Sequence, residues 1–217
     1  MHESFHLEET LPLPPGTSPF HVRGVIYASI IHGVGTLPGG MERFLDELVD
    51  VRVRDFMRQK FQFMGWYDVY PALPCAVAIA RLRGRPFEAF VREAAKDSML
   101  RLVPSMFRIF SRLGGPRLAA AHAPRLFQTY YDFVDLRLSR VGNEEGTGVI
   151  TGIPRYVAPQ IINHVIGIIA GALESLGATH IEASYRDVTT NGSSFGVELV
   201  TCRADFRWRL ATRGLRA

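Results

Sequence analysis

Hydrophobic residues recur at two different spacings along the chain, and the change between them divides the sequence. Up to about residue 127 the apolar positions follow helical spacing, as Phe44, Leu45 and Leu48 do among the charged residues of segment 41–61. From residue 129 onward, apolar and polar residues mostly alternate, which is typical of strands with one buried face. The sequence therefore predicts a helical first part and a sheet in the second part.

The first part is expected to hold several short helices. Segment 70–83 begins with prolines near its first turn and ends with arginines, and these residues suit the two ends of a helix. Glycine at 84, and glycines with a proline at 114–116, end the helices that precede them. The predicted helices cover residues 22–34, 41–61, 70–83, 86–96, 98–113 and 117–127.

The second part is expected to form four strands and one helix. Asn191-Gly192 is a strong signal for a hairpin turn. Apolar positions change face between Leu199 and Val200, which predicts a β-bulge. The order β-β-α-β-β after the helices predicts an α+β fold, with N-terminal helices packed on a C-terminal four-stranded antiparallel sheet. The predicted strands cover residues 129–140, 148–153, 180–188 and 195–210, and the predicted helix covers residues 156–178.

Segment 156–178 is one of the most apolar in the chain. Between Pro159 and Glu174 lie only residues 160–173, and Gln160, Asn163 and His164 interrupt even these. A membrane span needs ~20 mostly apolar residues, so we predict a helix buried in the core, and the chain is not expected to be transmembrane. Its GxxxG pattern, formed by Gly167 and Gly171, predicts close packing of the helix backbone against a neighbour.

Size and composition indicate one globular domain. The 217 residues are 47% apolar and 21% charged, and we expect a single domain at 20–217 behind a flexible, acidic and proline-rich tail at 1–19. This tail lacks the features of a signal peptide. The net charge of +4 is small, so no nucleic-acid partner is expected. Cys75 and Cys202 have no metal-ligand spacing, which favours a reducing, cytoplasmic location.

A catalytic site is not predicted. The pentapeptide 192–196 matches the GxSxG pattern of serine hydrolases. A nucleophile elbow, however, requires a helix after the serine and a histidine downstream. In this sequence a strand is expected after Ser194, and no histidine follows it. The hairpin interpretation is therefore preferred, and we expect no enzyme activity.

Several side chains are candidates for the lining of an apolar ligand pocket. His122 and His164 are polar residues in apolar helices, and the segment around Met106 is soft and aromatic, as such pockets are. Each of these residues also fits an ordinary place in the core, and both interpretations stay open. The candidate ligand-binding residues are His122, His164, Phe107, Phe110, Met106, Leu126, Tyr130, Arg155 and Cys75. No metal site is predicted.

Four strings in the sequence carry a resemblance to a known superfamily. They are RGVIYASII at 23–31, FEAFVREAAKDSMLRLVPSMFRIFSRLG at 87–114, PRLFQTYYDFVDLRL at 124–138 and VIGIIAGALESLGA at 165–178. With the order of elements, they resemble the haem-nitric-oxide/oxygen-binding (H-NOX) domains, the vinyl-reductase-type domains and the Bet-three subunits of the TRAPP tethering complex. The likeness runs from about Arg23 to Leu210 and looks closest to a group of proteins from myxobacteria and their relatives.

The resemblance implies roles for individual residues. In H-NOX domains a helix just before the sheet carries the histidine that binds haem iron, and His122 falls near that place. The Tyr-x-Ser-x-Arg motif that holds the haem propionates is replaced by TGIPRYVAP, which offers only Arg155. Vinyl-reductase-type domains often have clustered cysteines near the C-terminus, whereas segment 185–208 has only Cys202. Bet-three proteins hold an acyl chain in a tunnel, and Cys75 is a candidate counterpart of their acylated cysteine. The cofactor therefore stays unknown, with haem as one candidate.

These features lead to one main hypothesis and one alternative. The main hypothesis is a non-enzymatic binding or sensor domain for a hydrophobic small molecule, either a fatty acyl chain or a tetrapyrrole, held between the helices and the sheet. The alternative is a module for protein–protein interaction or dimerisation with a filled core. The expected partners are a hydrophobic small molecule or lipid, and a second copy of the chain or another protein.

Overall fold

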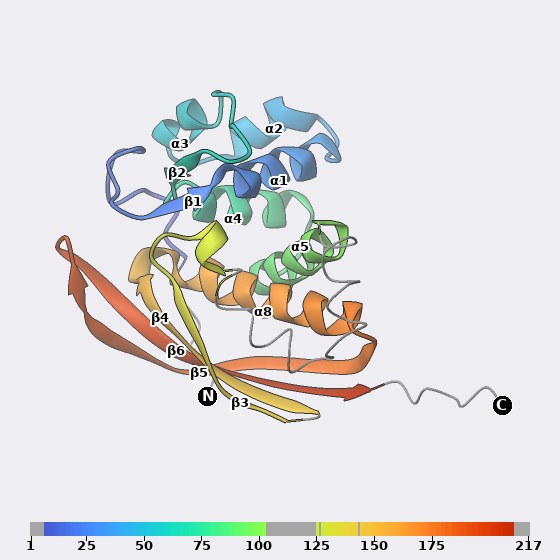
Figure 1. Ribbon diagram of the computed structural model, residues 1–217. Coiled ribbons are helices and arrows are strands. Elements are labelled where there is room, and N and C mark those ends of the chain that lie inside the picture. Colours follow the sequence, from blue (N-terminus) through green and yellow to red (C-terminus); the bar gives the residue numbers. More distant parts are fainter. Residues whose placement is uncertain (1–6, 103–124, 126, 143, 211–217) are drawn as a thin grey trace.

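The computed structural model describes residues 7–102, 125, 127–142 and 144–210 (Figure 1). Its elements lie in layers: α8 packs on the sheet, α5 packs on α8, and α1 and α4 lie beyond α5. In chain order the elements are β1 (His21–Arg23), α1 (Gly24–Gly35), α2 (Gly40–Glu47), α3 (Val51–Phe56), β2 (Trp66–Asp68), α4 (Ala72–Leu82), α5 (Phe87–Leu102), β3 (Asp135–Val141), β4 (Glu145–Pro154), the 3-10 helix η1 (Arg155–Val157), α8 (Ala158–Ser175), β5 (Ala178–Ser194) and β6 (Val197–Leu210).

The main sheet is four-stranded and antiparallel, in the order β3-β4-β6-β5. The face of β6 that holds Cys202, Ala204 and Phe206 is buried, while Arg203 and Arg207 are exposed on the other face. This alternation is the one that the sequence predicts for a sheet with one covered face. The predicted α+β fold, with N-terminal helices on a C-terminal four-stranded sheet, is confirmed.

The N-terminal helices differ from the sequence prediction in two places. Segment 41–61 forms two helices instead of one, because the chain is extended at Leu48 and Asp50 begins α3, accepting a hydrogen bond from the Arg52 backbone N–H. Conversely, the helices expected at 86–96 and 98–113 are a single helix, α5, as far as Leu102. No glycine or proline interrupts it near residue 97. Residues 103–124 lie outside the described part.

The first predicted strand is shorter than expected. Residues 127–130 are helical, and β3 begins only at Asp135. Aromatic and branched residues at 129–134 therefore mislead the prediction, because the first two end a helix and several of the others are buried where the helix joins the sheet. Tyr131 and Val134, for instance, are only 2% and 3% exposed.

The hairpin between the last two strands turns later than predicted. The turn residues are Phe195 and Gly196, with φ of +52° and +74°. Two consecutive left-handed residues suit the tight turns that match the twist of a hairpin. Asn191-Gly192 instead lies inside β5, in a stretch where the pairing with β6 shifts between Thr190 and Ser193. The Asn-Gly pair therefore marks an irregularity of the strand, which is a bulge and not the predicted hairpin turn.

The predicted change of face in the last strand coincides with a bulge in its neighbour. Ile150 pairs with Cys202 and Ile153 pairs with Val200, so β4 has one extra residue at this level. Gly152 lies within the bulge and has φ of +78°, a conformation that glycine adopts without strain.

Residues 7–20 lie against the helices, which differs from the flexible tail expected at 1–19. Leu11 is 4% exposed, and its backbone N–H donates to Asp50 at 3.0 Å. The backbone N–H groups of Gly16 and Ser18 donate to buried Asp68. These bonds add donors to two buried carboxylates, which also accept from Arg52 and from the Tyr70 backbone N–H.

The apolar helix α8 is a core helix. By length and composition alone Arg155–Ser175 could cross a membrane, but 72% of its apolar window is buried inside the fold. A Cβ added at Gly167 would lie 2.2 Å from the Arg92 carbonyl oxygen on α5, and one added at Gly171 would lie 2.9 Å from the Lys96 carbonyl oxygen. The two glycines thus let α5 and α8 approach closely, as the GxxxG pattern predicts.

Candidate functional site

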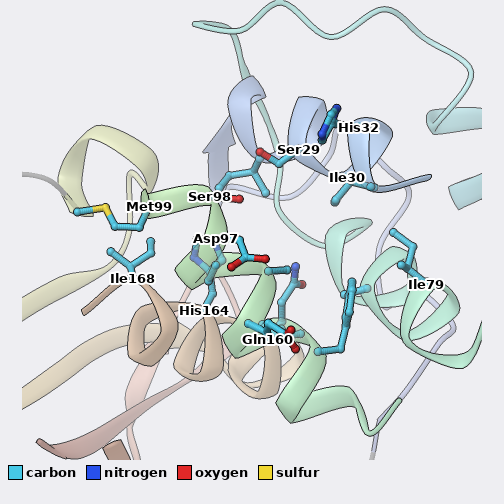
Figure 2. Close-up of a pocket in the computed structure, with 18 of the residues that line it drawn as sticks. Ser29, Ile30, His32, Ile79, Asp97, Ser98, Met99, Gln160, His164 and Ile168 are labelled. Carbon is cyan, nitrogen blue, oxygen red and sulfur yellow. The ribbon is translucent and has the colours of Figure 1, made fainter. Parts of the chain in front are cut away.

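A cavity of about 330 Å³ lies between α1, α4, α5 and α8 (Figure 2). This volume is at the lower end of the roughly 300–1,000 Å³ typical of small-molecule sites. Its walls are largely apolar and include Val25, Ile30, Ile79, Val91, Met99 and Ile168. No residue of the described strands lines it, because α8 stands between the cavity and the sheet. The sequence hypothesis places a ligand between helices and sheet, whereas this cavity lies one layer away, among helices.

Two polar side chains of α8 face this cavity, Gln160 and His164. They are four residues apart, so they project from the same side of the helix. Figure 2 shows both side chains extending from α8 toward the space between α5 and α1. The cavity therefore combines apolar walls with a small number of polar groups, which is the usual composition of a ligand site.

His164 is neutral and held in one orientation by a tyrosine. Burial lowers its pKa to about 4, because the charged imidazole would lose its hydration. Its Nδ1 lies 2.7 Å from the hydroxyl oxygen of Tyr131. That hydroxyl is buried and makes no other hydrogen bond with the described residues.

The hydrogen bond between Tyr131 and His164 assigns the proton on the imidazole. If Nδ1 donated to Tyr131, the buried hydroxyl proton would have no acceptor among the described residues, at a free-energy cost of about 1–3 kcal/mol. The hydroxyl therefore donates to Nδ1, and Nε2 carries the N–H of the neutral ring. Nε2 makes no hydrogen bond with the described residues, so His164 presents a donor to the cavity.

Gln160 has an amide with unused hydrogen-bonding capacity. The residue is 7% exposed, and its Oε1 is buried without a partner in the described part of the chain. Its Nε2 makes no bond there either. A half-turn about the Cγ–Cδ bond exchanges the two atoms, so the amide can present either an acceptor or a donor to the cavity.

Asn163, the neighbour of His164, has a structural role. Its side-chain N–H donates to the Pro159 carbonyl at 2.8 Å, and its Oδ1 accepts from Nε of Arg92 at 2.6 Å. Arg92 also reaches the Ala183 carbonyl on β5 at 3.5 Å. Asn163 therefore joins α8 to α5 and does not line the cavity.

Charged side chains occur at the exposed rim of the cavity. Arg85 is paired with Glu93. Arg83 donates to the Gly33 carbonyl at 3.1 Å and to the Thr36 hydroxyl at 2.7 Å. Asp97 is exposed and has no cationic partner among the described residues. The rim thus carries charges of both signs, while the groups on α8 are neutral.

The structure brings together only some of the predicted site residues. His164 and Tyr130 line the cavity. Arg155 lies elsewhere: its guanidinium is about half exposed and pairs with Glu198 on β6 at 2.8 Å. The other candidates, His122, Phe107, Phe110, Met106 and Leu126, lie outside the described residues.

Cys75 is buried behind the cavity wall. It is 0% exposed, and burial raises the pKa of its thiol far above the ordinary value. Its neighbours Ala76 and Ile79 line the cavity, but Cys75 itself does not. A thiolate, which is the reactive form, is therefore strongly disfavoured here, and its acylation stays a prediction from the resemblance.

Comparison with known proteins identifies the fold. The sequence matches no protein-family model and has no significant match among curated proteins. Solved structures do match. An H-NOX protein from K. algicida in the Fe(II) unliganded state has a TM-score of 0.59 at 9% identity, covering 88% of this chain and 98% of the other. The I5F mutant of T. Tengcongensis H-NOX has a TM-score of 0.59 at 10% identity, covering 88% and 99%.

A third match is described as an oxygen-binding H-NOX domain related to soluble guanylate cyclases, with a TM-score of 0.55 at 10% identity over 86% of this chain and 95% of the other. The chain has the H-NOX fold. The H-NOX part of the resemblance is thus supported at the level of fold, while the likeness to vinyl-reductase-type, Bet-three and myxobacterial proteins stays a resemblance.

The H-NOX fold raises the question of haem, and His164, the histidine that α8 contributes to the described cavity, does not fit a haem iron. An iron-binding histidine keeps its proton on the nitrogen that does not bind the metal. For Nε2 of His164 to bind iron, Nδ1 would have to donate to Tyr131, which would leave the tyrosine proton without an acceptor among the described residues. Nor do these residues contain a cluster of three or more His, Cys, Asp or Glu side chains placed to hold a metal ion.

The sequence predicts the histidine of this cavity but not its partner on the same helix. Gln160 is recognised there only as an interruption of an apolar segment. Its spacing of four residues from His164 is the signal that could have paired them. Ser29, Asp97 and Arg83 line the cavity only because of the way α1, α4 and α5 pack together, and no local sequence pattern predicts that packing.

Proposed function

We propose that this chain is a non-enzymatic binding or sensor domain for a hydrophobic small molecule held in the cavity between α1, α4, α5 and α8. The observation that carries the proposal is an apolar cavity of about 330 Å³ with two neutral polar side chains facing it. Burial of an apolar ligand supplies affinity at roughly 25 cal/mol per Å². The H-NOX fold supports the proposal, since one protein with that fold is described as oxygen-binding.

Of the two ligand classes expected from the sequence, a short acyl chain is favoured over a tetrapyrrole. His164 does not fit iron, and the volume of the cavity is at the low end for ligand sites. A flexible apolar chain can follow the space between helices. His164 and Gln160 would then orient the polar end of such a molecule.

Native mass spectrometry of the purified chain, compared with its denatured spectrum and an absorption scan, tests this proposal. We expect an additional mass that is lost on denaturation. A band near 400 nm would indicate a tetrapyrrole, and a mass that survives denaturation would indicate acylated cysteine. The band would contradict the favoured ligand class, and the surviving mass would contradict a non-covalent ligand in this cavity.

A pair of variants on α5 gives the matched control. Ala94 lines the cavity, whereas Ala89 is exposed on the same helix and does not line it. Ala94→Trp should fill the cavity mouth and reduce the bound fraction about tenfold or more, and Ala89→Trp should leave it unchanged. Equal ligand retention by both variants would contradict binding in this cavity.

The alternative, an interaction module, is favoured by one surface feature. Phe63, Met64 and Trp66 are adjacent in the chain and 52%, 62% and 40% exposed. Exposed apolar groups of this kind can mark contact surfaces. A bare mass in the native spectrum, together with a dimeric mass, would support this alternative in place of ligand binding.

A further inference from the structure

The loop between α3 and β2 presents two apolar side chains at the tip of a tight turn. The Gly65 N–H donates to the Gln62 carbonyl at 3.0 Å, so Phe63 and Met64 occupy the two central positions of a β-turn. Both side chains are more than half exposed. Such positions usually hold glycine, proline or short polar residues, so this pair is unusual. Figure 1 shows the loop at the outer edge of the helical layer, away from the sheet.

The carbonyl groups of this turn have their hydrogen bonds within the protein. Those of Phe63 and Gly65 accept from the first two N–H groups of α1, at 3.0 and 2.8 Å. The Met64 carbonyl accepts from the Arg23 guanidinium at 2.6 Å, and the Gln62 carbonyl accepts within the turn. Backbone groups that are already paired can leave water at low cost, and apolar layers of a membrane admit backbone only on this condition.

The N–H groups at the tip complete the accounting for the turn. Those of Phe63 and Met64 have no partner among the described residues. They can therefore donate to the phosphate or ester oxygens of lipid headgroups, which are acceptors. The turn thus combines exposed apolar side chains with donors that suit the headgroup region.

Two cations without an acidic partner flank the turn. The Arg23 guanidinium carbon lies 3.8 Å from the centroid of the Trp66 ring, and its bonds in the described part of the chain go to backbone carbonyls. Lys60 lies three residues before Phe63, is exposed, and forms no ion pair with the described residues. Segment 51–66 contains four basic residues and one acidic residue. Cations beside apolar and tryptophan side chains are the usual composition of surfaces that bind anionic bilayers.

We propose that this turn docks the protein on an anionic lipid bilayer, with Phe63 and Met64 entering the headgroup region and Lys60 facing the phosphates. A second copy of the chain is a less suitable partner, because two copies meeting at this turn would bring like charges together. A protein partner would need a pocket shaped for the turn, whereas a bilayer accepts it without one. The inference goes beyond the proposed function and does not depend on a ligand in the cavity.

Co-sedimentation of the full chain with lipid vesicles at pH 7 is the first measurement. The vesicles are of phosphatidylcholine, with or without about 30% phosphatidylserine. We expect the anionic vesicles to bind about tenfold or more tightly than the neutral ones, and this binding should weaken when NaCl is raised from about 0.1 M to about 0.5 M. Absence of binding, equal binding to both vesicles, or no effect of salt would overturn the proposal.

Trp66 reports which face of the protein docks. It is 40% exposed, whereas the second tryptophan of the chain, Trp208, is 4% exposed within the sheet. Docking by this turn should move the Trp66 emission to shorter wavelength and make it sensitive to quenching by brominated lipids. Binding to vesicles with no change in tryptophan emission would show that another face docks, and would overturn the proposal.

The double variant Phe63→Gln with Met64→Gln tests the apolar tip. Both side chains are exposed, so the fold should tolerate the change, and affinity for anionic vesicles should fall about tenfold or more. Phe195→Asn is the matched control. It removes an aromatic ring that is 80% exposed at another turn, where the φ of +52° suits asparagine. This control should keep the affinity of the parent chain.

Lys60→Gln tests the cationic flank. We expect affinity for anionic vesicles to fall about fivefold, because one cation near the surface is lost. Arg207→Gln is the control, since it lowers the net charge equally but lies on the exposed face of the sheet. Its affinity should stay within about twofold of the parent. Equal effects of Lys60→Gln and Arg207→Gln would overturn docking by the turn, because only net charge would then matter.

The remaining outcomes separate a bilayer from a protein partner. Unchanged vesicle binding by the double variant would overturn the role of Phe63 and Met64. Self-association of the parent chain in sedimentation velocity that the double variant abolishes, without binding to either vesicle, would assign the turn to contact with a second copy and overturn the proposal. Circular dichroism of each variant confirms that the fold is retained.

Discussion

Asn163 and His164 follow each other in the chain and face different partners. Asn163 bonds to Arg92 of α5 and is fully buried, whereas His164 bonds to Tyr131 and faces the cavity. On a helix, neighbouring residues point about 100° apart, so a polar pair in an apolar segment can serve two purposes. The structure thus assigns one member to the joint between helices and the other to the candidate ligand site.

The buried imidazole makes stability depend on pH in a defined window. The pKa of His164 is lowered from 6.5 to about 4, so between these values the unfolded chain binds a proton that the folded chain does not. Stability is therefore fully present above pH 6.5 and falls as the pH is lowered toward 4. Between pH 7 and pH 5 the loss from this group should be on the order of 2 kcal/mol.

Denaturant unfolding of the parent chain and His164→Asn at both pH values measures this effect. The asparagine does not titrate, so the difference between pH 7 and pH 5 should shrink in this variant. His180→Asn is the control, because His180 is exposed and its φ of +50° is a conformation that asparagine tolerates. An identical pH dependence in all three proteins would show that His164 is not held neutral by burial.

At this scale the sequence reveals the kind of residue but not its surroundings. It marks His164 because a histidine is unusual in an apolar segment. It cannot show that the tyrosine at 131, separated by more than thirty residues, determines which nitrogen carries the proton. The sequence does not distinguish Gln160 for the same reason: its unmet hydrogen bonds are a property of the packed core.

Among the elements, the contact between α5 and α8 determines the shape of the site. Gly167 and Gly171 bring the two backbones together, and the cavity opens beside this contact along Ala95, Met99 and His164. Close approach at one point and separation at the next are both needed, because a uniformly tight contact would leave no space for a ligand.

Gly167→Ala should destabilise the fold by about 1–3 kcal/mol, since the new Cβ would lie 2.2 Å from the Arg92 carbonyl oxygen and 2.7 Å from the Ala95 Cβ. Gly35→Ala is the matched control in a helix, because nothing lies within 4 Å of its Cβ position. It should be neutral or slightly stabilising. Thermal or urea unfolding of both variants gives the comparison, and equal effects would show that α5 and α8 do not pack as closely as described.

Element order and the existence of helices and strands follow from the sequence, while several boundaries do not. The split between α2 and α3 depends on Asp50, whose carboxylate also binds Leu11 of the N-terminal segment. The hairpin turn at Phe195-Gly196 is decided by pairing with β6 over many residues. In both places a distant contact outweighs the local signal.

In the molecule as a whole, the N-terminal segment completes the helical layer. Leu11 is buried, its N–H binds Asp50, and a hydrogen bond from Arg52 holds the pKa of Asp50 at about 2. Asp68 receives two backbone N–H groups from Gly16 and Ser18. The segment therefore stabilises two acidic side chains, one that begins α3 and one that precedes α4.

Removal of residues 1–19 should cost about 3 kcal/mol or more in the free energy of unfolding, because it exposes the site of Leu11 and leaves Asp50 and Asp68 with fewer donors. Removal of residues 1–6 is the control, since none of these contacts involves them. Chemical unfolding of both truncated chains provides the measurement. A stability after removal of 1–19 that equals the control would mean that the segment is a dispensable tail.

Arg92 connects three layers of the fold, namely α5, α8 and the sheet. Its guanidinium bonds to Asn163 on α8 and extends to the Ala183 carbonyl on β5, at the edge of the sheet. The helix that carries it, α5, also forms one wall of the cavity. The longer of these two bonds, at 3.5 Å, is the one that an outward movement of α5 from the sheet would strain first. Through Arg92, occupation of the cavity would change a hydrogen bond to β5, an exposed strand on the opposite side of α8.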